Sequence, residues 1–334
     1  MTASNVESIA AELRRQATEN PPKHPIDIDY NSITGVAHSY NERCPDPRLR
    51  FVMQSLVKHL HDFARHVDLT TDEWMRAIQF LTQTGQTCND VRQEFILLSD
   101  VLGLSTLVDS LNHPKPKGAT ESTVLGPFFT TDAPDVVDGG SIVSEAKAEE
   151  GELLLVRGKV LDLDGNAVAN ATIETWETDA TGHYDTQYDD RTVADCRGRI
   201  TSQSDGSFQY GAILPVSYPI PGDGPVGSLL LRLGRHVYRP SHLHLWVQAD
   251  GFDPLITALY PREDKFLQSD TVFGVKSSLV VDPVLVDDPS EARKHGFKRN
   301  SFWLIEYDLI LCTLAQAKEE REQVKRVPTS QHNL

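Results

Sequence analysis

The sequence predicts a mainly β protein with an α-helical N-terminal region, in which an antiparallel β-sandwich follows a helical domain. Over the first hundred or so residues, apolar side chains recur every three or four positions, which is the period of amphipathic helices. Beyond Pro114, short apolar stretches are separated by Gly, Pro, Asp and Asn, as in sheets with many turns. We therefore expect a helical domain over residues 1–115 and a β-sandwich domain over residues 116–334.

The helical half is predicted to begin with a short helix. Ser4 and Glu7 have the spacing of a capping box ahead of the apolar residues Ile9 and Leu13. A polar, proline-rich stretch over residues 20–47 then interrupts the helical pattern. We expect no helix in that stretch.

Three longer helices are predicted next. Thr70 and Glu73 form a second capping-box pattern, and either Asn89 or Asp90 is a suitable cap for the last helix. Each helix has one apolar face, and most of the residues on these faces are expected in the core: Val52, Leu56, Leu60, Phe63 and Val67; Trp74, Ile78 and Leu81; Val91, Phe95, Leu98 and Leu102.

Turn signals divide the second half into short strands. Asp164-Gly165 predicts a hairpin turn, and Asp205-Gly206 predicts another turn. Strands are predicted over residues 153–160, 171–176, 208–213, 243–247, 279–281 and 301–311. The highly charged segment after Ala315 is predicted to form a solvated helix that frays.

Composition excludes several classes of partner. The formal net charge is −16, which opposes sequence-independent binding to nucleic acid and to anionic membranes. No apolar run reaches the roughly 18 residues that membrane insertion demands, and the N-terminus lacks a signal-peptide pattern. We expect a soluble, cytoplasmic protein. The cysteines are widely scattered, which favours buried thiols over disulfides or a zinc site: Cys44, Cys88, Cys196 and Cys312.

A His-x-His pair begins one of the predicted strands. His242 and His244 are two residues apart, so both rings point to the same face of a strand and can bind one metal ion. The alternative is a pair of surface histidines or of hydrogen-bonded core histidines.

Two tyrosines lie where the chain is expected to turn sharply. Tyr184 follows Gly182-His183, and Tyr218 follows a Pro-Val-Ser segment. Either is a candidate metal ligand. Each is equally compatible with an aromatic core residue whose hydroxyl finds a partner.

The combined order of these elements resembles the intradiol ring-cleaving dioxygenases. It runs from Trp176 through Gly182-His183-Tyr184, Leu214-Pro215-Val216-Ser217-Tyr218 and Gly234-Arg235-His236 to Arg239-Pro240-Ser241-His242-Leu243-His244. Residues 74–98 and 121–129 look like that family's helical segment and the linker into its catalytic sandwich. The resemblance therefore extends nearly end to end. It implies a homodimer formed through the helical domain, in some relatives with lipid bound between the subunits.

The resemblance also implies a ligand set. In that family two tyrosines and two histidines hold one Fe(III), and the matching positions here are Tyr184, Tyr218, His242 and His244. The tyrosine that matches Tyr218 is released when the diol chelates the iron, so it is also a catalytic candidate. Arg239 matches an arginine that stabilises negative charge on the ring. The alternative for Arg239 is a structural ion pair or a surface position.

The residue types agree with ferric iron. Ionising a free tyrosine, with a pKa of about 10, costs roughly 4 kcal/mol at pH 7, and a trivalent cation at bonding distance offsets that cost. Phenolate oxygens and imidazoles suit Fe(III) better than thiolates do. Two phenolates would be unusual at a zinc site, although donor type alone leaves zinc open.

A substrate pocket is implied by the same resemblance. Its positions are Leu97, Asp100, Val124, Gly126, Pro127, Phe128, Ile220, Pro221, Ala258 and Val272. Relatives that cleave hydroxyquinol carry Asp at the position of Asp100, where catechol-cleaving relatives tend to have a nonpolar residue, and the segment 272–276 also resembles the hydroxyquinol group. Ala258 departs from the glutamine of catechol relatives. For each apolar position, core packing is the alternative.

The implied reaction is cleavage of hydroxyquinol (benzene-1,2,4-triol) by O2 between adjacent hydroxyls, which gives maleylacetate. One alternative is catechol cleavage to cis,cis-muconate. Another is a non-catalytic β-sandwich binding module. A binding module needs no four-residue ferric site, and all four residues are present in this sequence.

Overall fold

The computed structural model describes residues 3–19, 27–89 and 92–326. The chain divides into two compact units, Met1–Leu81 and Thr82–Leu334, which are considered one at a time. The second unit contains all the candidate site residues. Asp90, one of the two predicted caps, and the apolar residue Val91 lie outside the described residues. The other predicted cap, Asn89, does not cap the helix, which begins at Glu94 after Gln93.

The first unit is helical, as predicted. Its helices are α1 (Ala3–Glu19), α2 (Ile33–Asn41), α3 (Pro47–His66) and the first part of α4 (Thr71–Thr87). Thr70 and Glu73 form the predicted capping box, because Glu73 N–H donates to Thr70 Oγ1 and Thr70 N–H donates to Glu73 Oε2. Ser4 lies inside α1 and is therefore not its cap.

Two expectations for the helices are wrong. The proline-rich stretch contains α2, which buries Val36 and follows a turn in which Asp29 Oδ1 accepts the N–H groups of Asn31 and Ser32. Most residues of the apolar faces are also not core, since Leu60 is 56% and Phe63 57% exposed, although Leu98 is buried as expected. Amphipathic periodicity shows that a face needs covering, not what covers it.

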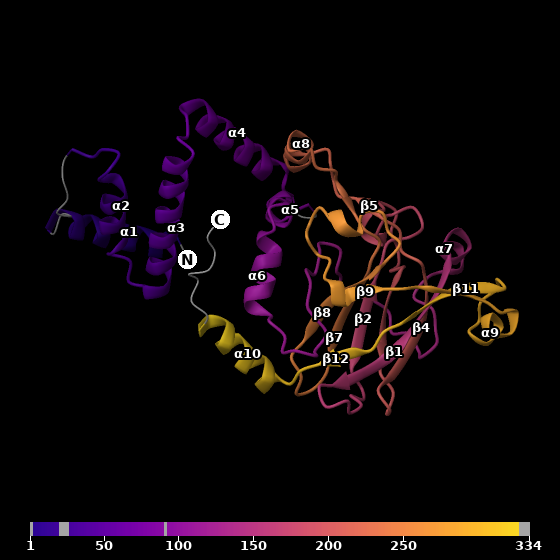
Figure 1. Cartoon of the computed structure of the whole chain (residues 1–334). Helices are drawn as coiled ribbons and strands as arrows, with labels where there is room; N and C mark the ends of the chain where they lie inside the picture. Colours follow the sequence, from indigo (N-terminus) through magenta and orange to yellow (C-terminus); the bar gives the residue numbers. More distant parts are fainter. Residues whose placement is uncertain (1–2, 20–26, 90–91, 327–334) are drawn as a thin grey trace. The chain divides into compact units, whose positions relative to one another are not determined.

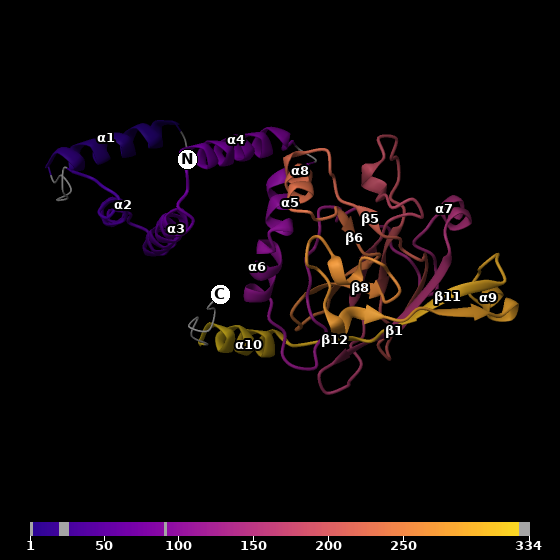
Figure 2. The same cartoon turned by 45° about the horizontal axis from the view of Figure 1, so that its top comes forward.

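The second unit combines short helices with two sheets (Figure 1). The helices are α5 (Glu94–Val101), α6 (Leu104–Asn112), α7 (Glu145–Glu150), α8 (Pro225–Arg232), α9 (Pro289–Lys294) and the charged α10 (Leu314–Arg326). Within this unit, α7 and α9 lie at the end away from α5 and α6 (Figure 2). None of the described helices combines the length and apolar character needed to cross a bilayer. The four cysteines are free; Cys196 and Cys312 are buried, while Cys44 and Cys88 are half-buried.

The strands include every predicted one and several that were not predicted. They are β1 (Leu153–Asp162), β2 (Thr172–Trp176), β3 (Arg197–Thr201), β4 (Ser207–Ile213), β5 (Tyr218–Pro219), β6 (Tyr238–Arg239), β7 (Leu243–Gln248), β8 (Leu255–Pro261), β9 (Val280–Val281), β10 (Val284–Asp287), β11 (Ser301–Glu306) and β12 (Leu309–Leu311). The predicted strand over residues 301–311 is two strands, interrupted where the Tyr307 carbonyl passes so close to Gly158 that a side chain at Gly158 would collide with it.

The sheets are mixed rather than purely antiparallel, which corrects the prediction. One sheet has the order β10-β11-β1-β12 with β4 also paired to β1, a second has the order β3-β2-β7-β8-β9, and β5 and β6 form a two-stranded ribbon. β1 runs parallel to β11 and β12, and β8 runs parallel to β9. Parallel neighbours need a long connection, and here the second sheet is built between β1 and β11.

The predicted turns are formed but connect the two sheets. Gly165 and Gly206 both have positive φ, +80° and +79°, which glycine adopts without strain. The first turn leads from β1 to β2 and the second from β3 to β4, so each passes from one sheet to the other. The chain does fold back at Asp164-Gly165 as predicted, because Leu161 and Ala167 form an antiparallel bridge. However, β1 and β2 themselves are not paired with each other.

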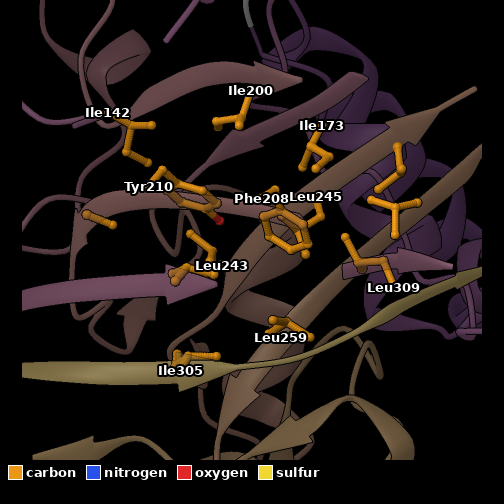
Figure 3. Packing of buried hydrophobic residues seen from close by; sticks show 14 of the residues in the cluster. Ile142, Ile173, Ile200, Phe208, Tyr210, Leu243, Leu245, Leu259, Ile305 and Leu309 are labelled. Carbon is orange, nitrogen blue, oxygen red and sulfur yellow. The ribbon is translucent and has the colours of Figure 1, made fainter. Parts of the chain in front are cut away.

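The core lies between the two sheets (Figure 3). Leu243, Leu245 and Val247 of β7 are buried in it with residues such as Phe208 of β4 and Ile305 of β11. Because side chains alternate along a strand, the intervening His244 and Trp246 face the opposite side of the sheet. That side carries a separate aromatic cluster, and the candidate site lies there.

Candidate metal centre and substrate pocket

Four predicted ligands are brought together on that face. The Tyr184 hydroxyl oxygen lies 3.4 Å from the Tyr218 hydroxyl oxygen and 3.3 Å from His242 Nε2. His242 Nε2 is 3.1 Å from His244 Nε2. All four side chains are at most 4% exposed. Residues separated by up to 60 positions in sequence thus bring two oxygens and two nitrogens together through three successive contacts of 3.1 to 3.4 Å.

Local structure explains why Tyr184 points inward. Gly182, at φ +83°, makes the preceding turn, and a Cβ there would lie 3.1 Å from the Cβ of Tyr218. The Asp179 carboxylate holds the same loop by accepting the N–H groups of Thr181 and His183. The Tyr184 ring stacks on Phe128, with ring centroids 4.3 Å apart.

The other three candidate ligands are placed by strands. Tyr218 of β5 is registered opposite Arg239 of β6. His242 immediately precedes β7, while His244 lies within it and stacks on Trp176 at 4.8 Å between ring centroids. The predicted strand alternation therefore brings both imidazoles to one face.

Hydrogen bonding and burial prepare the imidazoles for a cation. His242 Nδ1 lies 2.7 Å from the Pro240 carbonyl oxygen, so Nδ1–H donates to it and Nε2 keeps its lone pair. Burial lowers the pKa of His242 and of His244 well below the ordinary value, and neighbouring charge lowers both further. Neutral imidazole is the metal-binding form.

The donor spacing fits a single metal ion. Ligand atoms about 2 Å from one ion lie about 2.8 to 3.4 Å apart for the usual bond angles, and the contacts given above fall in that range. Burial raises the pKa of Tyr184 well above the ordinary value, with Tyr218 adding to the effect. A nearby cation would favour the phenolate form of Tyr184. Within the described residues no group of three His, Cys, Asp or Glu offers another metal site.

A pocket of about 560 Å³ opens beside these donors. Tyr218 and Arg239 line it, together with nearly all the predicted substrate-contact residues: Leu97, Asp100, Val124, Gly126, Pro127, Phe128, Ile220, Pro221 and Val272. Gly126, at φ +75°, lies beside His244, and a Cβ there would be in ordinary van der Waals contact with His244 Cε1 at 3.5 Å. Ala258 does not line the pocket; it is fully buried opposite His244 in the β7–β8 register.

Two of the charged side chains that line the pocket were predicted from sequence, Arg239 and Asp100. Arg239 is 3% exposed and its Nη1 donates to His242 Nε2 at 3.0 Å. Asp100 projects from α5 on another wall. Burial raises the pKa of Asp100, whereas its hydrogen bond with Ser105 and the charge of Arg239 oppose that rise. The pocket therefore combines apolar walls with a few charged side chains, as small-molecule sites commonly do.

Comparison with known proteins identifies the family. Residues 46–120 match the family model described as "Catechol dioxygenase N terminus", and residues 124–311 match the one described as "Dioxygenase". An intradiol ring-cleavage dioxygenase of Aspergillus niger is 51% identical over 90% of this chain and 89% of its own. The chain belongs to the intradiol ring-cleavage dioxygenases.

Two further relatives agree with this membership. A hydroxyquinol 1,2-dioxygenase of Rhizobium sp. is 46% identical over 80% of this chain and 90% of its own. The crystal structure of a hydroxyquinol 1,2-dioxygenase from Pseudomonas putida is 42% identical, covers 85% of this chain and 98% of its own, and superposes with a TM-score of 0.79. The helical region followed by a β-sandwich is the fold of the family, whose members use non-haem iron.

Some residues of this dioxygenase pocket were not predicted from sequence. Arg92, Thr130 and Asp189 form part of its polar rim. Asp270 and Tyr260 contact Arg239 from behind. They lie 31 and 21 positions after Arg239, and no local spacing connects them with it.

A buried ion pair behind Tyr184 was also not predicted. Arg197 is 2% exposed, and its Nε donates to both Asp185 oxygens at 3.0 Å. The same guanidinium donates to the Phe128 carbonyl oxygen at 3.0 Å. Asp185 follows Tyr184 in the sequence, and Phe128 stacks on the Tyr184 ring. The pair therefore joins the loop of one candidate ligand to a wall of the dioxygenase pocket.

Replacing Arg197 with alanine is expected to lower the free energy of unfolding by about 3 kcal/mol, because breaking a buried pair leaves Asp185 without its main partner. Arg191 Nε still donates to Asp185, which keeps the loss at the lower end of the usual range. Chemical denaturation measures it. Arg157→Ala, which breaks an exposed pair with Glu306, is the control and should lose less than about 1 kcal/mol. Equal losses of unfolding free energy in the two variants would show that the Arg197–Asp185 pair is not structurally important.

Proposed function

We propose that this chain cleaves hydroxyquinol between its adjacent hydroxyls, inserting both atoms of O2 to give maleylacetate. The observation that carries the proposal is the position of Asp100. It places a carboxyl group on the wall of a pocket that also contains Tyr218 and Arg239. Catechol has no third hydroxyl for that group to bind, whereas hydroxyquinol has one. Two relatives that carry the hydroxyquinol name support the same substrate.

We propose that Tyr184, Tyr218, His242 and His244 hold ferric iron. The oxygen and nitrogen donor set, its spacing and the lowered pKa of both imidazoles support this assignment. When bound, the iron would supply Lewis acidity that favours deprotonation of the diol hydroxyls, and a template for the substrate.

The protein residues have separate roles in this proposal. Tyr218 lines the pocket, whereas Tyr184 is fully buried behind it. Tyr218, as the phenolate that bound iron would stabilise, is therefore placed to accept a substrate proton and become a neutral phenol. Arg239 offers a fixed positive charge next to the ring, which requires no reorganisation during the reaction. Phe128 and Val272 form apolar walls that exclude water from the ring.

Asp100 selects the substrate in this account. The half-buried Asp100 carboxyl group already has one hydrogen bond, with Ser105. A substrate hydroxyl at the right position would satisfy its remaining acceptor capacity, which catechol would leave unmatched. A hydrogen bond to a charged group contributes about 1.5–3 kcal/mol, roughly ten- to a hundredfold in relative kcat/KM. The discrimination should favour hydroxyquinol over catechol.

Asp100→Ala is therefore expected to lower kcat/KM for hydroxyquinol by about ten- to a hundredfold, and to leave kcat/KM for catechol unchanged or higher. Steady-state oxygen uptake with both diols measures the two values, and iron content is determined in parallel. Asp189→Ala is the control, because Asp189 is an exposed carboxylate on the rim of the same pocket. It should leave the ratio of the two values unchanged. Equal losses for both diols in Asp100→Ala, or a wild type that prefers catechol, would refute the selector role.

We also propose that the helical unit forms a homodimer. The support is a row of exposed apolar side chains on α3, including Phe51 at 63%, Leu56 at 47% and Leu60 at 56% exposed. Exposed apolar surfaces of this kind mark sites where proteins or lipids bind. A bound lipid between the subunits is part of the same proposal.

A further inference from the structure

The Arg239 guanidinium is held by a buried carboxylate that no role in the proposed reaction explains. Arg239 Nε lies 3.2 Å from Asp270 Oδ1, and Arg239 Nη2 lies 3.2 Å from Asp270 Oδ2. Both side chains are at most 4% exposed. Two parallel N–H donors on two carboxylate oxygens fix the plane of a guanidinium as well as its position.

This pairing determines which edge of the guanidinium faces the donor cluster. With Nε and Nη2 directed at Asp270, Nη1 remains and points to His242 Nε2 at 3.0 Å. Nη2 also lies 3.4 Å from the Tyr260 hydroxyl oxygen. The orientation of Arg239 towards the donor cluster is therefore set by Asp270 and Tyr260, which lie on the opposite side of the guanidinium and belong to later segments of the chain.

Asp270 also holds a wall of the pocket. Its Oδ1 accepts the Val272 N–H at 3.2 Å and its Oδ2 accepts the Gly274 N–H at 2.8 Å. Val272 lines the pocket. Phe273, which lies between Val272 and Gly274, has a φ of +59°. Non-glycine residues adopt this conformation only when the surroundings impose it. One carboxylate thus connects the guanidinium with the tight turn that carries Val272.

Gly274 shows how closely this arrangement is packed. A Cβ at Gly274 would lie 2.8 Å from Arg239 Nη2, 2.8 Å from the Tyr260 hydroxyl oxygen and 3.1 Å from Asp270 Oδ2. No side chain fits there without displacing the guanidinium or its partners. The sequence thus provides a glycine where the backbone must approach Arg239.

We propose that Asp270 is a positioning residue for ring cleavage, and that its carboxylate fixes the plane of Arg239 while holding the Val272 wall. The inference rests on the proposed function, since it assigns Arg239 to the reaction. It goes beyond that function because Asp270 does not line the pocket and acts through Arg239.

Two variants test the proposal in the iron-loaded, full-length protein. Asp270→Asn keeps the shape of the side chain and removes its charge, so that it offers Arg239 one oxygen acceptor instead of two. Gly274→Ala keeps both charged partners and displaces the guanidinium sterically. Each is expected to lower kcat per bound iron by about ten- to a hundredfold, because misplacement of a fixed group by about 1 Å has effects of that size. KM for the diol should change less than about threefold in Gly274→Ala.

Asp282→Asn is the matched control. Asp282 pairs with Arg262 at 2.6 Å between Oδ1 and Nε, but both side chains are more than half exposed. This variant should keep wild-type kcat. If Asp270→Asn lost activity only in proportion to lost iron or to a lower melting temperature, with kcat per iron unchanged, Asp270 would be structural and the proposal would be overturned.

A second measurement, of the chemical accessibility of Arg239, does not depend on catalytic turnover. Phenylglyoxal modifies accessible arginines, and the modified peptides can be identified by mass spectrometry. Arg239 should be protected in the wild type and in Asp282→Asn, and should be modified at least about tenfold faster in Asp270→Asn, because the buried pair no longer holds it. Equal rates of Arg239 modification in all three proteins would contradict the proposal that Asp270 holds Arg239. If the wild type failed to cleave any diol, the proposed function would be wrong. The phenylglyoxal experiment would still decide whether Asp270 holds Arg239.

Discussion

His244→Ala is expected to yield a folded protein that retains no iron and has no visible colour, and His242→Ala should behave in the same way. Each change removes one of four donor atoms, each of which lies within 3.4 Å of another donor atom of the set. Loss of an outer hydrogen-bond partner of a metal ligand already lowers metal affinity by about 10–100-fold. Loss of a ligand itself should therefore exceed about a hundredfold. Iron quantification per chain and the visible absorption spectrum measure the two effects together.

His236→Ala provides the control for these variants. His236 lies only six positions before His242, but its Nε2 hydrogen bonds with Ser269 Oγ at 2.8 Å, away from the donor cluster. This variant should keep both iron and colour. One tightly bound iron per chain with wild-type colour in either ligand variant would show that the corresponding histidine is not a ligand. A colourless wild type with iron bound would favour the binding module over the enzyme.

The two tyrosines are expected to behave differently, although both belong to the donor set. Tyr184 is fully buried and stacks on Phe128, whereas Tyr218 lines the pocket from the two-residue strand β5. A substrate that enters the pocket meets Tyr218 first. Tyr184→Phe should therefore remove most of the phenolate-to-iron absorption, whether or not substrate is bound. Tyr218→Phe should change chiefly the spectrum of the resting enzyme.

Spectra recorded without oxygen, before and after addition of the diol, separate the two variants. Tyr188→Phe is a suitable control, because the Tyr188 hydroxyl donates to Asp179 at 2.5 Å and belongs to the loop rather than to the donor set. It should keep the wild-type spectrum in both states. If the substrate complexes of Tyr184→Phe and Tyr218→Phe had the same spectrum, the distinction between the two tyrosines would be wrong.

The sequence predicted the parts of the site that local rules govern. His242 and His244 are separated by two residues at the start of an apolar strand, and strand alternation alone places both rings on one face. Tyr184 and Tyr218 follow turn signals, but spacing does not place them beside the histidines. Their selection, like that of Asp100 and the other pocket residues, came from the resemblance to the dioxygenase family.

Other features depend on tertiary structure and leave no local signal. The Arg239–Asp270 pair joins residues 31 positions apart, and Arg197 reaches Asp185 across 12 positions. The parallel pairing of β1 with β11 depends on where the chain returns after building the second sheet. Similarly, periodicity located the apolar faces of α3 and α4 but could not show that Phe63 and Trp74 remain exposed.

Cleavage of hydroxyquinol under isotopically heavy dioxygen tests the central claim most directly. The wild-type, iron-loaded protein is supplied with the triol, and the product is analysed by mass spectrometry. An intradiol dioxygenase should give a ring-opened diacid that carries two heavy oxygen atoms, one in each new carboxyl group. A product with its ring intact, or one that contains no heavy oxygen, would contradict the account.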